Sequence, residues 1–164
     1  MRLALAALVA LLPAVAQKVH EVCAPCHNQH FEDFKTHKHF EKSLSCDACH
    51  GASQGHVSAG GNQLPDRVAG PADQPGLCGA CHTGQRKSYE SGKHGKLVLS
   101  GGAKKAPACT TCHGTHSLRK PAAMAQQCGR CHEALPAACK KDPPLAVKMA
   151  CAGCHDPHTQ AARR

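Results

Sequence analysis

The chain has 164 residues and a formal net charge of +9, with 15 Gly, 11 Pro and 13 Cys. It contains three Phe, one Tyr and no Trp. A chain of this length fits one domain, but these side chains bury too little apolar surface to offset the entropy of folding. The composition therefore excludes an ordinary aliphatic or aromatic core and requires another source of apolar mass.

The first predicted element is a secretory signal peptide over residues 1–16. Arg2 is a short positive region, residues 3–16 are apolar, and Ala14-Val15-Ala16 resembles an A-x-A cleavage site. The apolar run is too short for a membrane span, although an uncleaved anchor helix is the alternative. We expect a mature chain over 17–164 that is periplasmic or secreted and has no membrane insertion after cleavage.

Six copies of the pentapeptide Cys-x-x-Cys-His follow, and they are the signature of c-type haem attachment. A separation of three places both thiols on one side of a helical turn, where they bind the haem covalently, and the next His is the proximal iron ligand. Zinc ribbons, disulfides and thioredoxin-like motifs have no need of a His after every second Cys. The sequence therefore predicts six haems c as cofactors. The attaching cysteines are Cys23, Cys26, Cys46, Cys49, Cys78, Cys81, Cys109, Cys112, Cys128, Cys131, Cys151 and Cys154, and the proximal ligands are His27, His50, His82, His113, His132 and His155.

The motifs form three repeats of a two-haem unit, over 23–56, 78–116 and 128–158. The second motif begins 23 residues after the first in units one and three, and 31 residues after it in unit two, where 97–107 is a predicted loop insertion. The linker 51–76 is rich in Gly, Pro and Ala, which predicts a surface loop. Helices are expected at the motifs, at 30–38 and at 83–92, and no strand pattern is present. We expect a mainly α and irregular fold, with short helices and loops wrapped around the haem array in one domain and little or no β-sheet.

Eight further histidines are available as second, distal ligands of the haem irons. They are His20, His30, His37, His39, His56, His94, His116 and His158. This abundance favours bis-His coordination over Met ligation. The alternative for each is a hydrogen bond to a haem propionate.

The repeat ranks these candidates. His39 and His94 share a position twelve residues after the first proximal His of their units, and His116 and His158 each lie three residues after a second proximal His. His56 occupies the same region, six residues after its motif. A His three residues after its own motif lies on the proximal side of that haem, so we expect it to bind the iron of a neighbouring haem.

The sixth distal ligand stays open among several alternatives. Pro144 occupies the twelve-residue position in unit three, so His30 is the first substitute, with His20 and His37 as competitors. Alternatively, one iron is five-coordinate. Cys139 occupies the aromatic position of the other units, as a buried small residue, a thiolate ligand or half of an intermolecular disulfide.

The stretch CGACHTGQRKSYESGKHG followed by CTTCHGTH resembles multihaem cytochromes such as the periplasmic decahaem subunits of outer-membrane electron conduits. The pentahaem donor of periplasmic nitrite reductase and small class III-like cytochromes are similar in style. HFEKSLSCDACHGASQGH is similar to a stretch of these proteins, which puts His39 and His56 in distal positions. The resemblance covers nearly all of 19–158 and departs from the family at Pro144 and in the number of haems.

The resemblance implies electron transfer between redox partner proteins. These partners are a membrane quinol-oxidising cytochrome and a terminal reductase or an outer-membrane conduit. The competing hypothesis is a multihaem reductase of a small nitrogen or sulfur oxyanion, with one open haem iron.

The basic charge does not predict nucleic-acid binding. Loss of Arg2 leaves 19 basic and 11 acidic residues, and six haems add about twelve propionate charges, so the holoprotein is roughly +2 when oxidised and −4 when reduced. Many Lys and Arg are therefore expected to pair with propionates. The few aromatic residues also provide no platform for stacking bases.

Overall fold

The computed structural model describes residues 19–102, 105–132 and 151–163. The predicted signal peptide, Cys139 and Pro144 lie outside these residues. The described ranges consist of short helices and loops without a β-sheet, and an isolated antiparallel bridge joins His155 and Ala162. The predicted fold class, mainly α and irregular, is confirmed.

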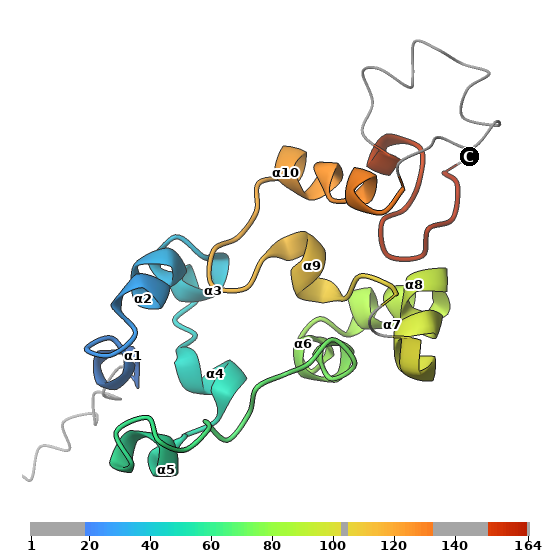
Figure 1. Cartoon of the computed structure of the whole chain (residues 1–164). Coiled ribbons are helices and arrows are strands. Elements are labelled where there is room, and N and C mark those ends of the chain that lie inside the picture. The colour runs from blue at the N-terminus through green and yellow to red at the C-terminus, as the bar shows by residue number, and fades with distance from the viewer. Residues whose placement is uncertain (1–18, 103–104, 133–150, 164) are drawn as a thin grey trace, which may run out of the picture.

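The first repeat unit contains five short helices, drawn in blue to green in Figure 1. The helix predicted over 30–38 is wrong in its bounds, since the chain turns after Lys35 and the N–H groups of Thr36 and His37 bond back to the carbonyls of Asp33 and Phe34. The helices are α1 (Val19–Cys23), α2 (Asn28–Lys35), α3 (Lys38–Glu41), α4 (Cys46–His50) and α5 (Gln54–Ser58).

The second and third units continue the same pattern. The prediction of a helix over 83–92 agrees closely with α7, whereas the predicted loop insertion begins with the end of α8 and a π-helical turn. The elements are α6 (Gln74–Gly79), α7 (Thr83–Ser91), α8 (Lys93–Leu97), the π-turn η1 (Val98–Gly102), α9 (Cys109–His113), α10 (Pro121–Gln126) and the short 3₁₀ turns η2 (Cys128–Arg130) and η3 (Cys151–Gly153).

Protein side chains alone form a very small core. Among the described hydrophobic residues, Tyr89, Val98 and Ala108 are buried. The Tyr89 hydroxyl donates a hydrogen bond of 2.8 Å to the carbonyl of Pro107, which attaches α7 to the segment before α9. In contrast, Leu64 is 85% exposed. This small core is what the composition predicts.

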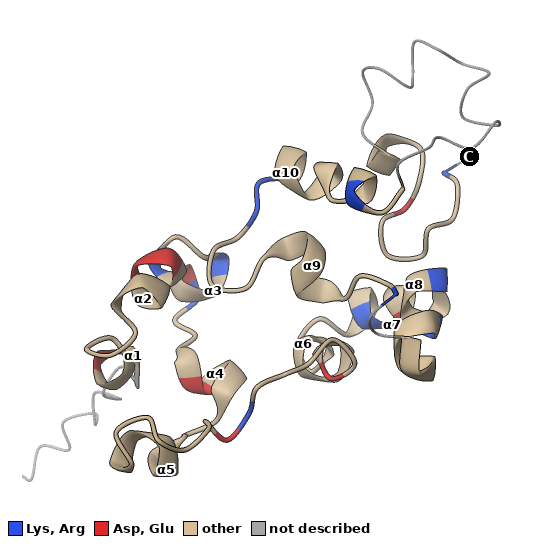
Figure 2. Ribbon diagram, in the orientation of Figure 1, with Lys and Arg blue, Asp and Glu red and all other residues tan. Residues whose placement is uncertain are grey.

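The helix between units two and three packs on the end of unit two. In Figure 1, α9 lies between α6 and α10, and it contacts both. Figure 2 shows acidic and basic residues interspersed along the ribbon. The ion pairs Glu32–Lys35, Lys38–Glu41 and Arg86–Glu90 each lie within one helix, where exposed pairs add little stability.

Candidate functional site

One helical turn shapes each Cys-x-x-Cys-His motif. The second and fourth motifs are themselves the helices α4 and α9. In the other four, the N–H of the motif His donates to the carbonyl of the first Cys at 2.9–3.0 Å. All twelve motif cysteines have free thiols. The backbone therefore presents two thiols and an imidazole from a single turn, as haem attachment requires.

The first cysteines of the two motifs in a unit lie in contact. In unit two, the Cys109 thiol donates a hydrogen bond to the Cys78 sulfur, which lowers the pKa of Cys78 to about 7 and raises the pKa of Cys109. In unit one, burial and the neighbouring Cys23 raise the pKa of Cys46 to about 11.

Unit three repeats this contact. Burial raises the pKa of Cys128, and the adjacent Cys151, to which it donates a hydrogen bond, raises this pKa further. The two attachment motifs of every unit are therefore neighbours in space.

Thiols of successive units are also close. Burial and then the charge of Cys78 raise the pKa of Cys49, which joins unit one to unit two. Cys112 likewise contributes to the raised pKa of Cys128, so these thiols of units two and three are also neighbours. The attachment motifs thus follow one another in space in the order of the chain.

Five motif histidines each face a second histidine, and each partner is one of the predicted distal ligands. The ring centroids are 5.8–6.1 Å apart, with interplanar angles of 14–35°. The structure shows no hydrogen bond between the rings of these described pairs. The pairs are His27–His56, His50–His116, His82–His39, His113–His158 and His132–His94.

These distances fit a haem iron held between two imidazoles. A metal–nitrogen bond of about 2 Å, with the ring centre roughly 1.2 Å behind the nitrogen, places the two centroids about 6 Å apart. Faces in van der Waals contact would approach to about 3.5–4 Å. The donor set therefore fits haem with two axial imidazoles.

In four of these pairs, one member has a lowered pKa and so favours the neutral imidazole, which is the form that binds a metal. Burial and then the partner His82 lower the pKa of His39, and burial and then His132 lower the pKa of His94. Burial likewise lowers the pKa of His113, to which His158 contributes. Burial lowers the pKa of His116, and the neighbouring His30 and then His50 lower it further.

Backbone carbonyls orient several of the rings. The Nδ1 atom of His50 lies 3.0 Å from the carbonyl of Arg67, and that of His56 lies 2.6 Å from the carbonyl of Gln63. When Nδ1–H donates such a bond, Nε2 keeps its lone pair for a metal. His155 makes the same contact with the carbonyl of Gln160 at 3.2 Å.

The linker 51–76 has a structural role that the sequence did not reveal. It supplies the carbonyls of Gln63 and Arg67 and is held by Asp66, whose carboxylate accepts a 2.7 Å bond from the Ser53 N–H. Gly51 has φ +75°, and a Cβ there would lie 2.9 Å from Asp66. The Gly-rich composition suggested a loop, but only this close approach shows why Gly51 is needed.

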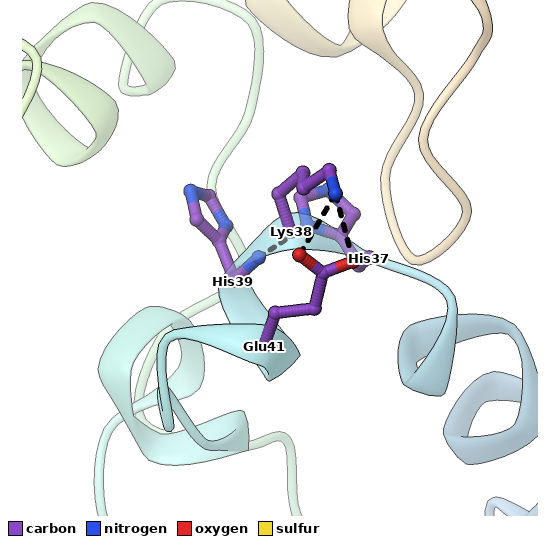
Figure 3. A network of polar contacts seen from close by, with 4 residues as sticks. All are labelled: His37, Lys38, His39 and Glu41. Atoms are coloured by element: carbon purple, nitrogen blue, oxygen red, sulfur yellow. Dashed lines mark hydrogen bonds and ion pairs between the residues drawn. The ribbon is translucent and has the colours of Figure 1, made fainter.

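The distal histidine His39 is supported by a buried neighbour. Its N–H donates a 3.1 Å bond to Nδ1 of His37, which caps α3. Figure 3 shows the His39 ring projecting away from the Lys38–Glu41 ion pair. His94 is held from unit three, because its N–H donates to the Gln160 side chain at 3.1 Å.

The three remaining candidates for a distal ligand, His20, His30 and His37, pack in unit one. His20 lies between Phe31 and Phe40, at centroid distances of 5.3 and 5.5 Å. The ring centroids of His37 and His39 are 4.6 Å apart.

His30, the predicted substitute for the sixth ligand, lies 4.4 Å from His116 and 6.1 Å from His27. It therefore lies between two rings that already have partners. The red segment of Figure 1, which includes η3 (Cys151–Gly153), lies away from α1–α3. The structure does not bring His30, His20 or His37 to His155.

Comparisons of this chain with protein-family models, with curated proteins and with solved structures find no match. Over the described ranges, no three His, Cys, Asp or Glu side chains gather as a site for a bare metal ion. In the same part of the chain, no helix is both long and apolar enough to cross a membrane.

Proposed function

We propose that this chain is an electron-transfer protein that carries six covalently attached haems c. The observation that carries the proposal is the set of five motif histidines, each facing a predicted distal histidine at 5.8–6.1 Å. When bound, haem supplies one-electron chemistry at its iron.

The protein's own residues attach, order and shield this cofactor. The motif thiols would fix each haem, and the closeness of the two motifs of a unit, as at Cys78 and Cys109, would place the two haems of that unit near each other. At five motifs, the two facing imidazoles would hold the iron from both sides. They would leave no open position for a substrate, which favours electron transfer over catalysis.

The proposed setting is the periplasm or the outside of the cell. It rests on the predicted signal peptide over 1–16 and on the resemblance to periplasmic multihaem cytochromes. The proposed partners are redox proteins: a membrane quinol-oxidising cytochrome and a terminal reductase or outer-membrane conduit.

The first test is the haem content of the full chain, expressed with a c-type haem maturation system. Mass spectrometry of the denatured protein should give the processed chain plus six haems. Electron paramagnetic resonance of the oxidised protein should show low-spin signals for at least five of them. A chain that retains fewer than six haems, or that remains high-spin throughout, contradicts the proposal.

The second candidate function is a multihaem reductase of a small nitrogen or sulfur oxyanion. It is favoured by one observation, that His155 faces none of the other described histidines. Steady-state assays with nitrite, hydroxylamine and sulfite and a reduced dye distinguish the two. Turnover that saturates with one of these substrates supports the reductase.

A further inference from the structure

The histidine pairs follow a rule that connects neighbouring units. His39 of unit one faces His82, the first motif His of unit two, and His94 of unit two faces His132, the first motif His of unit three. The histidine at the twelve-residue position of one unit therefore faces the first motif His of the next unit.

The opposite direction is equally regular. His116 of unit two faces His50, the second motif His of unit one, and His158 of unit three faces His113, the second motif His of unit two. The histidine that ends a unit therefore serves the second motif of the preceding unit.

This rule leaves two motifs without a donor, one at each end of the array. The first is that of His27, which faces His56 of its own unit, and α5 and the carbonyl of Gln63 hold His56 in place. The second is that of His155, which faces none of the other described histidines.

The rule also bears on the twelve-residue position of unit three, which Pro144 occupies. In units one and two this position faces the first motif of the next unit, so by the same rule it would not face any of the six motifs in this sequence. Pro144 lies outside the described residues, and its link to the sixth ligand stays a prediction. Among the described residues, the motif without a facing histidine is that of His155.

No histidine remains for this last motif. All fourteen histidines of the chain lie within the described residues. Ten form the five pairs, and His20, His30 and His37 pack in unit one.

A backbone carbonyl orients the ring of His155, as in the other motif His that contacts a carbonyl. Its Nδ1 contacts the Gln160 carbonyl at 3.2 Å, as His50 contacts that of Arg67. The loop after it is closed by bonds of 2.7–2.8 Å, from the Arg163 N–H to the Cys154 carbonyl and from the Asp156 N–H to the Ala161 carbonyl. Cys151 and Cys154 are both exposed in the described part of the chain.

We infer that the haem that Cys151, Cys154 and His155 would hold receives no second imidazole from this chain. In the ferrous state it binds a small neutral π-acceptor ligand of the carbon monoxide class. The inference rests on the proposed function, since it requires the haems to be bound.

The test is a carbon monoxide titration of the dithionite-reduced holoprotein, followed by its visible spectrum. We expect one carbon monoxide per six haems. The His56→Ala variant, which opens the iron of the first motif, should retain six haems and bind two. The Cys151→Ala/Cys154→Ala variant should hold five haems, all low-spin, and bind none.

Six low-spin haems that bind no carbon monoxide would overturn the inference while leaving electron transfer intact. Binding that persists in the Cys151→Ala/Cys154→Ala variant would overturn it as well, by placing the open iron elsewhere. If that variant does not fold, His155→Ala, which keeps both thiols, should hold six haems and change the visible spectrum of the carbon monoxide adduct. An adduct spectrum identical to that of the parent would overturn the inference. A parent chain with fewer than six haems would instead contradict the proposed function.

Discussion

The imidazole of His39 faces that of His82 with ring centroids 5.8 Å apart, although the two residues belong to different repeat units. Under the proposed function, the attachment motif and the second ligand of one haem would come from separate units. Haem binding in unit two would then depend on the folding of unit one.

The His39→Ala substitution tests this crossed arrangement. It should leave six haems attached, because all motif cysteines remain, but convert the haem at Cys78 and Cys81 to high spin. The high-spin fraction in electron paramagnetic resonance should rise by roughly one sixth of the haem. Substitution of the exposed Lys42 by Ala is the control and should not change the spin state. A His39→Ala protein whose spectrum matches the parent would show that His39 is not a ligand.

The His37→Ala substitution should destabilise the start of α3 by about 0.5–2 kcal/mol, because the side chain at this capping position accepts the His39 N–H. Asn retains an acceptor at this position, so His37→Asn should recover much of the loss. Thermal unfolding of the holoprotein by circular dichroism measures both. Equal loss in the two variants would mean that packing against Phe34, rather than the hydrogen bond, is what His37 supplies.

The Tyr89→Phe substitution should cost about 1 kcal/mol, because it removes the hydrogen bond to the Pro107 carbonyl. Burial raises the pKa of Tyr89 to about 12, above the value of about 10 for an unfolded chain. The neutral hydroxyl therefore stabilises the fold fully below pH 10, and this contribution is lost as the pH rises towards 12. Denaturant unfolding at several pH values should show the difference between parent and variant shrinking over this range. A difference independent of pH would contradict the assignment.

The sequence predicts some of these features well and others not at all. Motif histidines such as His113 and distal candidates such as His158 follow from spacing, because attachment chemistry fixes the spacing locally. The spacing does not predict which histidines face each other, because His158 and His113 belong to different units and meet only in the folded chain. The short-helix fold class follows from composition, whereas the end of α2 at Lys35 depends on local turn bonds that spacing does not encode.

The linker between units one and two is where sequence reasoning was least informative. Its Gly and Pro content predicts a loop but not that the loop carries carbonyls to His50 and His56. Those contacts are made by the backbone, which is the same for every residue type. Only the fold shows which carbonyl is near a given ring.

The Asp66→Ala substitution tests this role of the linker. Asp66 and Ser53 bond reciprocally, from the Ser53 N–H to the carboxylate at 2.7 Å and from the Asp66 N–H to the Ser53 hydroxyl at 3.2 Å. Without the carboxylate, the segment that supplies the Gln63 and Arg67 carbonyls loses its anchor, and the His56 and His50 rings gain rotational freedom.

We expect broader low-spin signals and altered reduction potentials for the two haems of unit one, with those of units two and three unchanged. Asp66→Asn, which retains an acceptor oxygen, is the matched control and should give a smaller effect. Potentiometric titration followed by visible spectroscopy measures the change. Because the carbonyl of Gln63 lies nearer its ring than that of Arg67, at 2.6 Å against 3.0 Å, the haem ligated by His56 should shift more than the haem at His50. Equal shifts at all six haems would mean that Asp66 supports the domain as a whole rather than these two ligands.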